Sequence, residues 1–107
     1  MPKRPDRPYK IIFLGDQGSV LRALGERAAE RGVFDAYAVA VKSIQHRLTT
    51  DPLVWGDPQN HLPHLQLLLC HGTRVPLHVY FAVDEQRRIV YVRDIKPFPS
   101  CGLDDAP

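Results

Sequence analysis

Cationic and aromatic side chains gather in the last third of the chain, where two strand-like runs flank a polar turn. They are Arg74, His78, Arg93 and Lys96, with Tyr80 and Tyr91 close by. Guanidinium, ammonium and imidazole groups bind phosphate, and aromatic rings stack on bases. Alternation along a strand puts His78 on the face of Tyr80, and Lys96 on that of Asp94, whose charge opposes it. The four cations are therefore candidate phosphate contacts and candidate catalytic residues, and the alternative is an ordinary solvated sheet edge.

A second group has metal-ligand chemistry but unfavourable spacing. His61 and His64, with Cys70 and His71, include the side chains that zinc prefers, but Pro63 and the strand-like context disfavour a tetrahedral site. Cys70 and His71 are neighbours on an expected strand, so their side chains point to opposite faces and cannot form a nucleophile–base pair. We expect Cys70 to be a small buried apolar side chain, and we expect neither a metal nor an organic cofactor.

The strands that would position these residues are marked by valine, isoleucine and aromatic side chains. Residues 9–14 predict a first strand that ends at Gly15. Residues 74–83 and 88–96 flank a charged turn and predict a β-hairpin.

Between the first strand and the hairpin, the pattern is less regular. Residues 61–71 are rich in leucine and predict another strand, followed by a turn at Gly72-Thr73. Residues 53–60 contain proline and glycine around Trp55 and predict a loop, with the indole closing the edge of the core or, less favourably, stacking on a base.

Two amphipathic patterns predict helices. Leu21, Leu24 and Ala28 form one apolar stripe, between a cap at Asp16 or Ser19 and a stop at Gly32.

The second helix is expected to start near Asp35 and to end before Pro52. Its apolar stripe consists of Tyr37, Val41, Ile44 and Leu48. These elements predict an α+β fold of the order β-α-α-β-β-β, in which a two-helix hairpin packs on one side of a small antiparallel sheet and the first strand pairs with a later one.

Length and composition indicate one domain. The chain has 107 residues, of which 44% are hydrophobic and 24% charged, with a net charge of +2. We divide it into a basic proline-rich arm at 1–8, a single domain at 9–98 and a tail at 99–107. Two cysteines and no long apolar run favour reduced thiols, a cytoplasmic location and no membrane partner.

The order of elements, together with the hairpin segment Val79–Val92 and the link Asp51–Pro58, resembles the RelE/ParE toxin superfamily of bacterial type II toxin–antitoxin modules, which includes plasmid stabilisation system proteins. The resemblance covers residues 9–98 and implies the RelE-like order given above. It also implies a cognate antitoxin. Resemblance to the RelE branch implies a metal-independent endoribonuclease acting on mRNA at the ribosome, in which basic residues stabilise the phosphate while the 2′-hydroxyl attacks. Resemblance to the ParE branch implies inhibition of gyrase by protein contact.

The chain departs from the nuclease branch at two positions. It has Pro76-Leu77-His78 where that branch usually has an arginine, and Lys96-Pro97-Phe98 where it has a basic pair followed by an aromatic acid/base residue. Phenylalanine cannot transfer a proton. Two alternatives therefore remain open: a catalytically degenerate domain that binds a protein partner, and a small RNA-binding domain that uses the same face.

Overall fold

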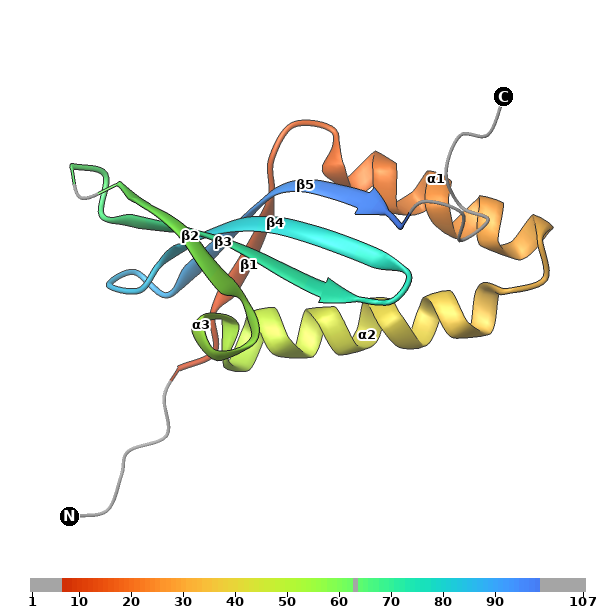
Figure 1. Cartoon of the computed structure of the whole chain (residues 1–107), viewed down its shortest axis with the longest axis horizontal. Coiled ribbons are helices and arrows are strands. Elements are labelled where there is room, and N and C mark those ends of the chain that lie inside the picture. The colour runs from red at the N-terminus through yellow and green to blue at the C-terminus, as the bar shows by residue number, and fades with distance from the viewer. Residues whose placement is uncertain (1–6, 63, 99–107) are drawn as a thin grey trace, which may run out of the picture.

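The structure is a computed structural model that describes residues 7–62 and 64–98 of the chain. The described part has an α+β fold with a five-stranded mixed sheet (Figure 1). The elements in chain order are β1 (Lys10–Phe13), α1 (Gln17–Glu30), α2 (Phe34–Thr50), α3 (Pro52–Trp55), β2 (Asp57–Leu62), β3 (Leu67–Arg74), β4 (Leu77–Asp84) and β5 (Ile89–Pro97). No helix of residues 7–62 or 64–98 is long and apolar enough to cross a bilayer.

The sheet has the strand order β1-β5-β4-β3-β2. The prediction that the first strand pairs with a later one is confirmed, because β1 pairs with β5. The prediction of a purely antiparallel sheet is wrong: β1 runs parallel to β5, and the other neighbours are antiparallel. A parallel pair needs a long connection between its strands, and the helices and the other strands supply it here.

The predicted order β-α-α-β-β-β misses two elements, α3 and β2. The segment 53–60, predicted as a loop, contains most of α3 and the start of β2. The sequence of β2, Asp-Pro-Gln-Asn-His-Leu, has no strand-forming pattern, and the strand forms because it pairs with the outer edge of β3. Pro58 is tolerated there because β2 is an edge strand, which has a strand partner on one side only and needs no N–H donor on the other. The register also shifts between Pro58 and Asn60.

The turn predicted at Gly72-Thr73 is also wrong, because both residues lie inside β3. The chain turns instead at Val75 and Pro76, which a cis peptide bond joins. Gly72 serves close packing: a Cβ at this position would lie only 2.4 Å from the Trp55 ring. A glycine within a strand often marks such a close approach.

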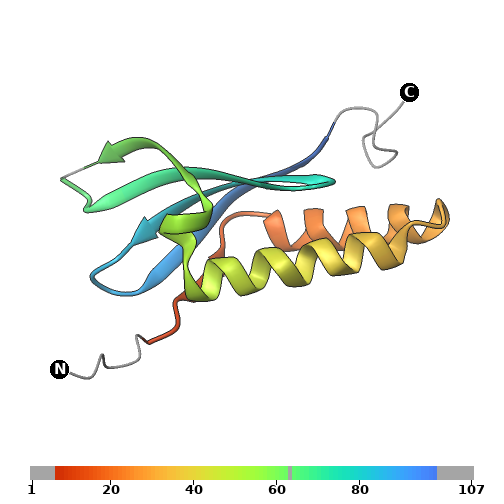
Figure 2. The same ribbon diagram turned by 60° about the horizontal axis from the view of Figure 1, so that its bottom comes forward.

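The two long helices lie on one side of the sheet (Figure 2). In α2, Tyr37, Ile44 and Leu48 are buried and Val41 is partly buried, which confirms the predicted stripe. The helix begins at Phe34, one residue before the expected cap at Asp35. In α1, Leu24 and Ala28 are buried, and Leu21 packs against the core.

The core lies between these helices and the facing side chains of β4 and β5. These side chains are Leu77, Val79, Phe81 and Val83 of β4, and Val90, Val92 and Ile95 of β5. They follow the two-residue period of a strand, except at a bulge where the β4–β5 register shifts after Tyr80. Each such side chain contributes about 1.5–3 kcal/mol when fully buried.

Two polar contacts fix the helices to one another and to the sheet. The Tyr37 hydroxyl of α2 donates a hydrogen bond to the Leu21 carbonyl of α1 at 2.6 Å, and burial raises the pKa of Tyr37 to about 12. β5 extends beyond the last residue of β1, and there the Gln17 side-chain oxygen accepts a hydrogen bond from the Ile95 backbone N–H at 2.8 Å. The start of α1 therefore replaces the missing strand partner.

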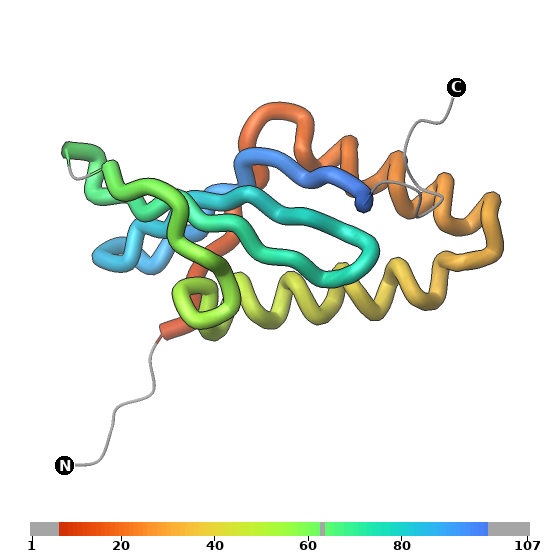
Figure 3. Tube along the Cα trace, in the orientation of Figure 1, coloured from red at the N-terminus to blue at the C-terminus, as the bar shows by residue number. Residues whose placement is uncertain are grey.

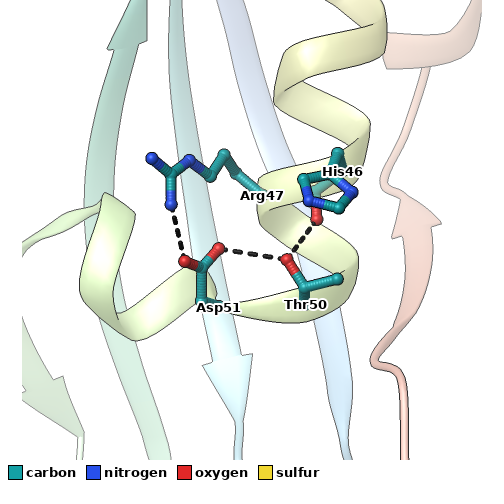
Figure 4. A network of polar contacts seen from close by, with 4 residues as sticks. All are labelled: His46, Arg47, Thr50 and Asp51. Carbon is teal, nitrogen blue, oxygen red and sulfur yellow. Dashed lines mark hydrogen bonds and ion pairs between the residues drawn. The ribbon is translucent and has the colours of Figure 1, made fainter.

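A polar network at the end of α2 directs the chain into α3 (Figure 4). Arg47 pairs with Asp51 at 2.6 Å, and the Thr50 hydroxyl donates to the His46 carbonyl at 2.7 Å. The backbone carbonyl of Asp51 then accepts hydrogen bonds from the backbone N–H groups of Val54 and Trp55, the first such bonds of α3. The trace in Figure 3 follows this short helix into β2 at the edge of the sheet. Trp55 at the end of α3 stacks on Phe81 of the core, with ring centroids 5.8 Å apart.

Candidate nucleic-acid interface

We call the side of the sheet away from α1 and α2 the open face (Figure 2). Alternation along β4 places Leu77 and Val79 under the helices and His78 and Tyr80 on the open face. On β3, His71 lies opposite Tyr80 in the register and is therefore on the open face as well. The same alternation that builds the core thus brings these rings together.

Four aromatic rings from three segments form a stack on the open face. The His71 ring lies 4.6 Å from Tyr80 and 5.1 Å from His78, and His78 lies 4.2 Å from Phe98, measured between centroids. The planes of these three pairs are within 15–24° of parallel. Phe98 is held beside the β3–β4 turn because its backbone N–H donates to the Pro76 carbonyl at 2.8 Å.

A hydrogen bond joins the two histidines within this stack. The Nε2 atom of His71 lies 2.9 Å from the Nδ1 atom of His78. Both side chains are partly exposed. Within the described residues, neither imidazole has another hydrogen-bond partner. The second nitrogen of each ring is therefore available to a ligand.

The environment of His78 favours its neutral state. Partial burial, and to a lesser degree the nearby His71, lowers the pKa of His78 from its ordinary value of 6.5. Lys96 lies opposite His78 in the register, and its ammonium group is 3.4 Å from the Asp94 carboxylate and 5.9 Å from the centre of the Tyr80 ring. The site therefore combines a histidine whose neutral form is favoured with a cation, Lys96, whose charge Asp94 partly compensates.

A loss of stability on acidification follows from the lowered pKa of His78. Well above pH 6.5 the imidazole is neutral in both the folded and the unfolded state, and the shift has no effect. As the pH falls through 6.5 the unfolded chain takes up the proton first, so the free energy of unfolding decreases until the pH is below the lowered value. We expect the urea midpoint of His78→Gln to depend less steeply on pH in this window than that of the parent. His46 is an exposed residue of α2, so His46→Gln should show the same pH dependence as the parent. An unchanged slope in His78→Gln would contradict the assignment.

The four predicted phosphate contacts do not all lie together. His78 and Lys96 are direct cross-strand neighbours. Arg93 is exposed and is the extra residue at the β5 bulge, without a partner in the register, so strand alternation does not assign its side chain to either face. Arg74 is exposed but lies opposite the fully buried Leu77 in the register, which places it on the other face of the sheet from His78. The grouping of Arg74 with His78 and Lys96 was therefore wrong.

The sequence analysis did not include His71 or Phe98 in this site. His71 was considered only as a candidate metal ligand and as a partner of Cys70, and a turn placed at Gly72-Thr73 would have separated it from His78. Only the strand register, in which His71 faces Tyr80, reveals the pair. Phe98 was noted as a residue unable to transfer protons, and its stacking on His78 could not be foreseen from spacing.

Cys70 and His71 lie where strand alternation predicts. Cys70 is fully buried in the core, as expected, and burial raises the pKa of its thiol. Its neighbour His71 points to the opposite face, also as expected. Among residues 7–62 and 64–98, no group of three histidine, cysteine or acidic side chains is placed to hold a metal ion. Cys101 lies outside the described residues.

No protein-family model, no curated protein and no solved structure matches the chain.

Proposed function

We propose that the chain is the toxin-like component of a type II toxin–antitoxin module, of the RelE/ParE kind, and that it acts as a metal-independent endoribonuclease on mRNA at the ribosome. The observation that carries the proposal is the open face, where a hydrogen-bonded histidine pair lies beside Lys96 in a stack of aromatic rings. In this proposal a cognate antitoxin is the protein partner, and the cytoplasm is the site of action.

The arrangement of the elements supports the resemblance on which this proposal rests. A strand, an antiparallel helical hairpin and three consecutive antiparallel strands, β3, β4 and β5, are present in that order. The helices lie on one face of the sheet, and His71, His78 and Tyr80 on the other face are partly exposed. The additional α3 and β2 lie between the hairpin and these strands, at the edge of the sheet, and do not interrupt the open face.

The chemistry of the open face supports RNA as the ligand. Arg93 is exposed and forms no ion pair within the described part of the chain, so its guanidinium is available to a phosphate. Lys96 and the histidines supply further N–H donors, and Tyr80 and Phe98 add aromatic surface at the two ends of the stack. The carboxylates of Asp94 and Asp57 partly neutralise the positive charge of the open face. This favours binding of individual phosphates at defined positions, and disfavours non-specific attraction to a broadly positive surface.

Induced expression tests the proposal in vivo. In a bacterial host, the wild-type chain should arrest growth and produce messages cleaved within their coding regions, as read by primer extension. His78→Gln should grow normally at an equal protein level, and His46→Gln should arrest growth like the wild type. Normal growth and intact messages with soluble, folded wild-type protein would remove the active-toxin proposal.

RNA binding by purified protein provides a separate prediction. Arg93→Ala should weaken the binding of a fluorescent single-stranded RNA and lower the slope of log K against log salt by about 0.7, the value for one phosphate contact. Lys42→Ala removes an equal charge from the exposed surface of α2 and should change neither quantity. Equal effects of the two substitutions would show that binding is non-specific and not located on the open face.

The second candidate function is a catalytically degenerate RelE/ParE-like domain that binds a protein or RNA without cleaving it. The observation that favours it is Phe98, which stacks on His78 near the position where the nuclease branch has an aromatic proton-transfer residue. Binding of RNA with a steep salt dependence but without cleavage, or stable co-purification with an antitoxin without growth arrest, would favour this candidate.

A further inference from the structure

We propose that His71 and His78 act together as a proton relay in RNA cleavage, with one imidazole as the general base and the other as the general acid. This inference rests on the proposed function and adds His71 as a catalytic residue. It starts from the 2.9 Å contact between His71 Nε2 and His78 Nδ1 on the open face.

The hydrogen bond fixes complementary roles on the two outward nitrogens. A neutral imidazole carries one N–H and one lone pair. If His71 Nε2 is the donor, then His71 Nδ1 has the lone pair and His78 Nε2 carries the N–H. If His78 Nδ1 is the donor, these two roles are exchanged. In either arrangement, the pair presents one proton acceptor and one proton donor to a ligand on the open face.

This pair of roles is what metal-independent cleavage of RNA requires. The acceptor nitrogen removes the proton of the 2′-hydroxyl while the 2′-oxygen forms a bond to phosphorus. The proton in the shared hydrogen bond moves to the partner ring, and the outward N–H of that ring gives its proton to the 5′-oxygen as the P–O5′ bond breaks. The products are a 2′,3′-cyclic phosphate and a 5′-hydroxyl end. The pair remains neutral, with the direction of its hydrogen bond reversed, and returns to its first state by exchanging protons with water.

The groups next to the pair hold one ring in place and bring charges of both signs near it. Tyr80 of β4 stacks on His71 and holds its ring in place. The charged residues on the same face as the pair are Asp94 and Lys96 of β5 and Asp57 of β2, which lies opposite His71 in the register, and Arg93 precedes Asp94 at the β5 bulge. The charges of these acids and cations partly compensate one another, as in the ion pair of Lys96 with Asp94. Lys96, opposite His78, is placed to stabilise the charge that develops on the phosphate.

The test uses the purified full chain and a message bound to bacterial ribosomes, with cleavage followed at single turnover. His71→Gln keeps an amide that can bond to His78 Nδ1 but cannot relay a proton. We expect it to cleave about 10²–10⁴-fold more slowly, the usual contribution of general acid–base groups, while RNA affinity changes by less than about twofold. Free imidazole should restore part of the activity of His71→Ala. The control variant His46→Gln should behave as wild type.

The pH profile distinguishes a relay from a merely structural role. The wild-type rate should rise with pH as His78 loses its proton, at a value below 6.5, and then level off. His71→Gln should lack this step. Addition of 1,10-phenanthroline, which removes transition metals and leaves ribosomal Mg²⁺, should not change the wild-type rate, and inhibition would overturn the relay in favour of a metal site at the histidines.

The remaining outcomes separate this inference from the proposed function. If His71→Gln cleaves as fast as the wild type with the same pH profile, the relay is excluded and the nuclease proposal stands. If the wild type binds RNA without cleaving it, the relay fails and the degenerate binding domain is favoured. If the wild type neither binds RNA nor arrests growth, both fail.

Discussion

Ile44→Asp is expected to unfold the domain. Ile44 lies in the buried stripe of α2 and is only 8% exposed. Loss of the side chain from the core costs about 2–5 kcal/mol, and burying a carboxylate without a partner adds to this. A domain of this size has a total stability of about 5–15 kcal/mol. Thermal unfolding followed by circular dichroism should therefore show no cooperative transition.

Val39→Asp is the matched control, because it introduces the same charge into the same helix. Val39 is 57% exposed, so its replacement removes little buried surface and leaves the carboxylate in water. We expect a cooperative transition near the wild-type temperature for this variant. If Ile44→Asp behaved in the same way, the packing of α2 against the sheet would be refuted.

Gly72→Ala is expected to displace Trp55 from the core. The added methyl group would lie 2.4–2.7 Å from three atoms of the indole ring, which is too close for any carbon contact. The ring must then move away from Phe81, on which it stacks. Overpacking of this kind costs about 1–3 kcal/mol. Trp55 is the only tryptophan of the chain, so a red shift of its fluorescence, together with a lower urea midpoint, reports the displacement directly.

Gly18→Ala supplies the comparison for this second prediction. Gly18 is in α1, and no atom lies within 4 Å of the position that its Cβ would take. Alanine is the better helix former by about 0.5–1 kcal/mol, so this variant should be at least as stable as the parent. An unchanged emission maximum in Gly72→Ala would show that the indole does not lie over β3.

The elements that were predicted well are those whose apolar residues repeat with one period. The stripe Tyr37, Val41, Ile44 and Leu48 has helical spacing over the whole of α2, and it packs as that spacing requires. The alternation in β4 likewise assigned His78 and Tyr80 to one face, and that in β5 assigned Lys96 to the face of Asp94, as the register bears out. In both cases the spacing of apolar residues within one element predicts which of its side chains are buried in the fold.

The elements that were missed depend on contacts distant in the sequence. β2 has no apolar alternation and is extended because it pairs with β3. Gly72 has the composition of a turn, but its role is set by Trp55, which reaches it from α3. Neither contact leaves a signal in the neighbouring residues, so a local reading assigned a loop and a turn.

The candidate site was predicted in part for the same reason. His78, Arg93 and Lys96 belong to the hairpin, whose two strands and turn were predicted from the sequence. His71 belongs to the preceding strand, and its position opposite Tyr80 depends on β3 continuing through Gly72. The sequence therefore indicated a cationic face, whereas the histidine pair became apparent only from the structure.

The position of β5 has a consequence for the way this domain is made. β5 comes after all the other strands in the chain, yet it lies inside the sheet, between β1 and β4. Until it leaves the ribosome, β1 has no strand to pair with, and the apolar sides of the helices lack much of the surface that they cover. Pairing between such distant segments is slow. Synthesis should therefore yield a collapsed, protease-sensitive intermediate that becomes native only after translation has passed β5.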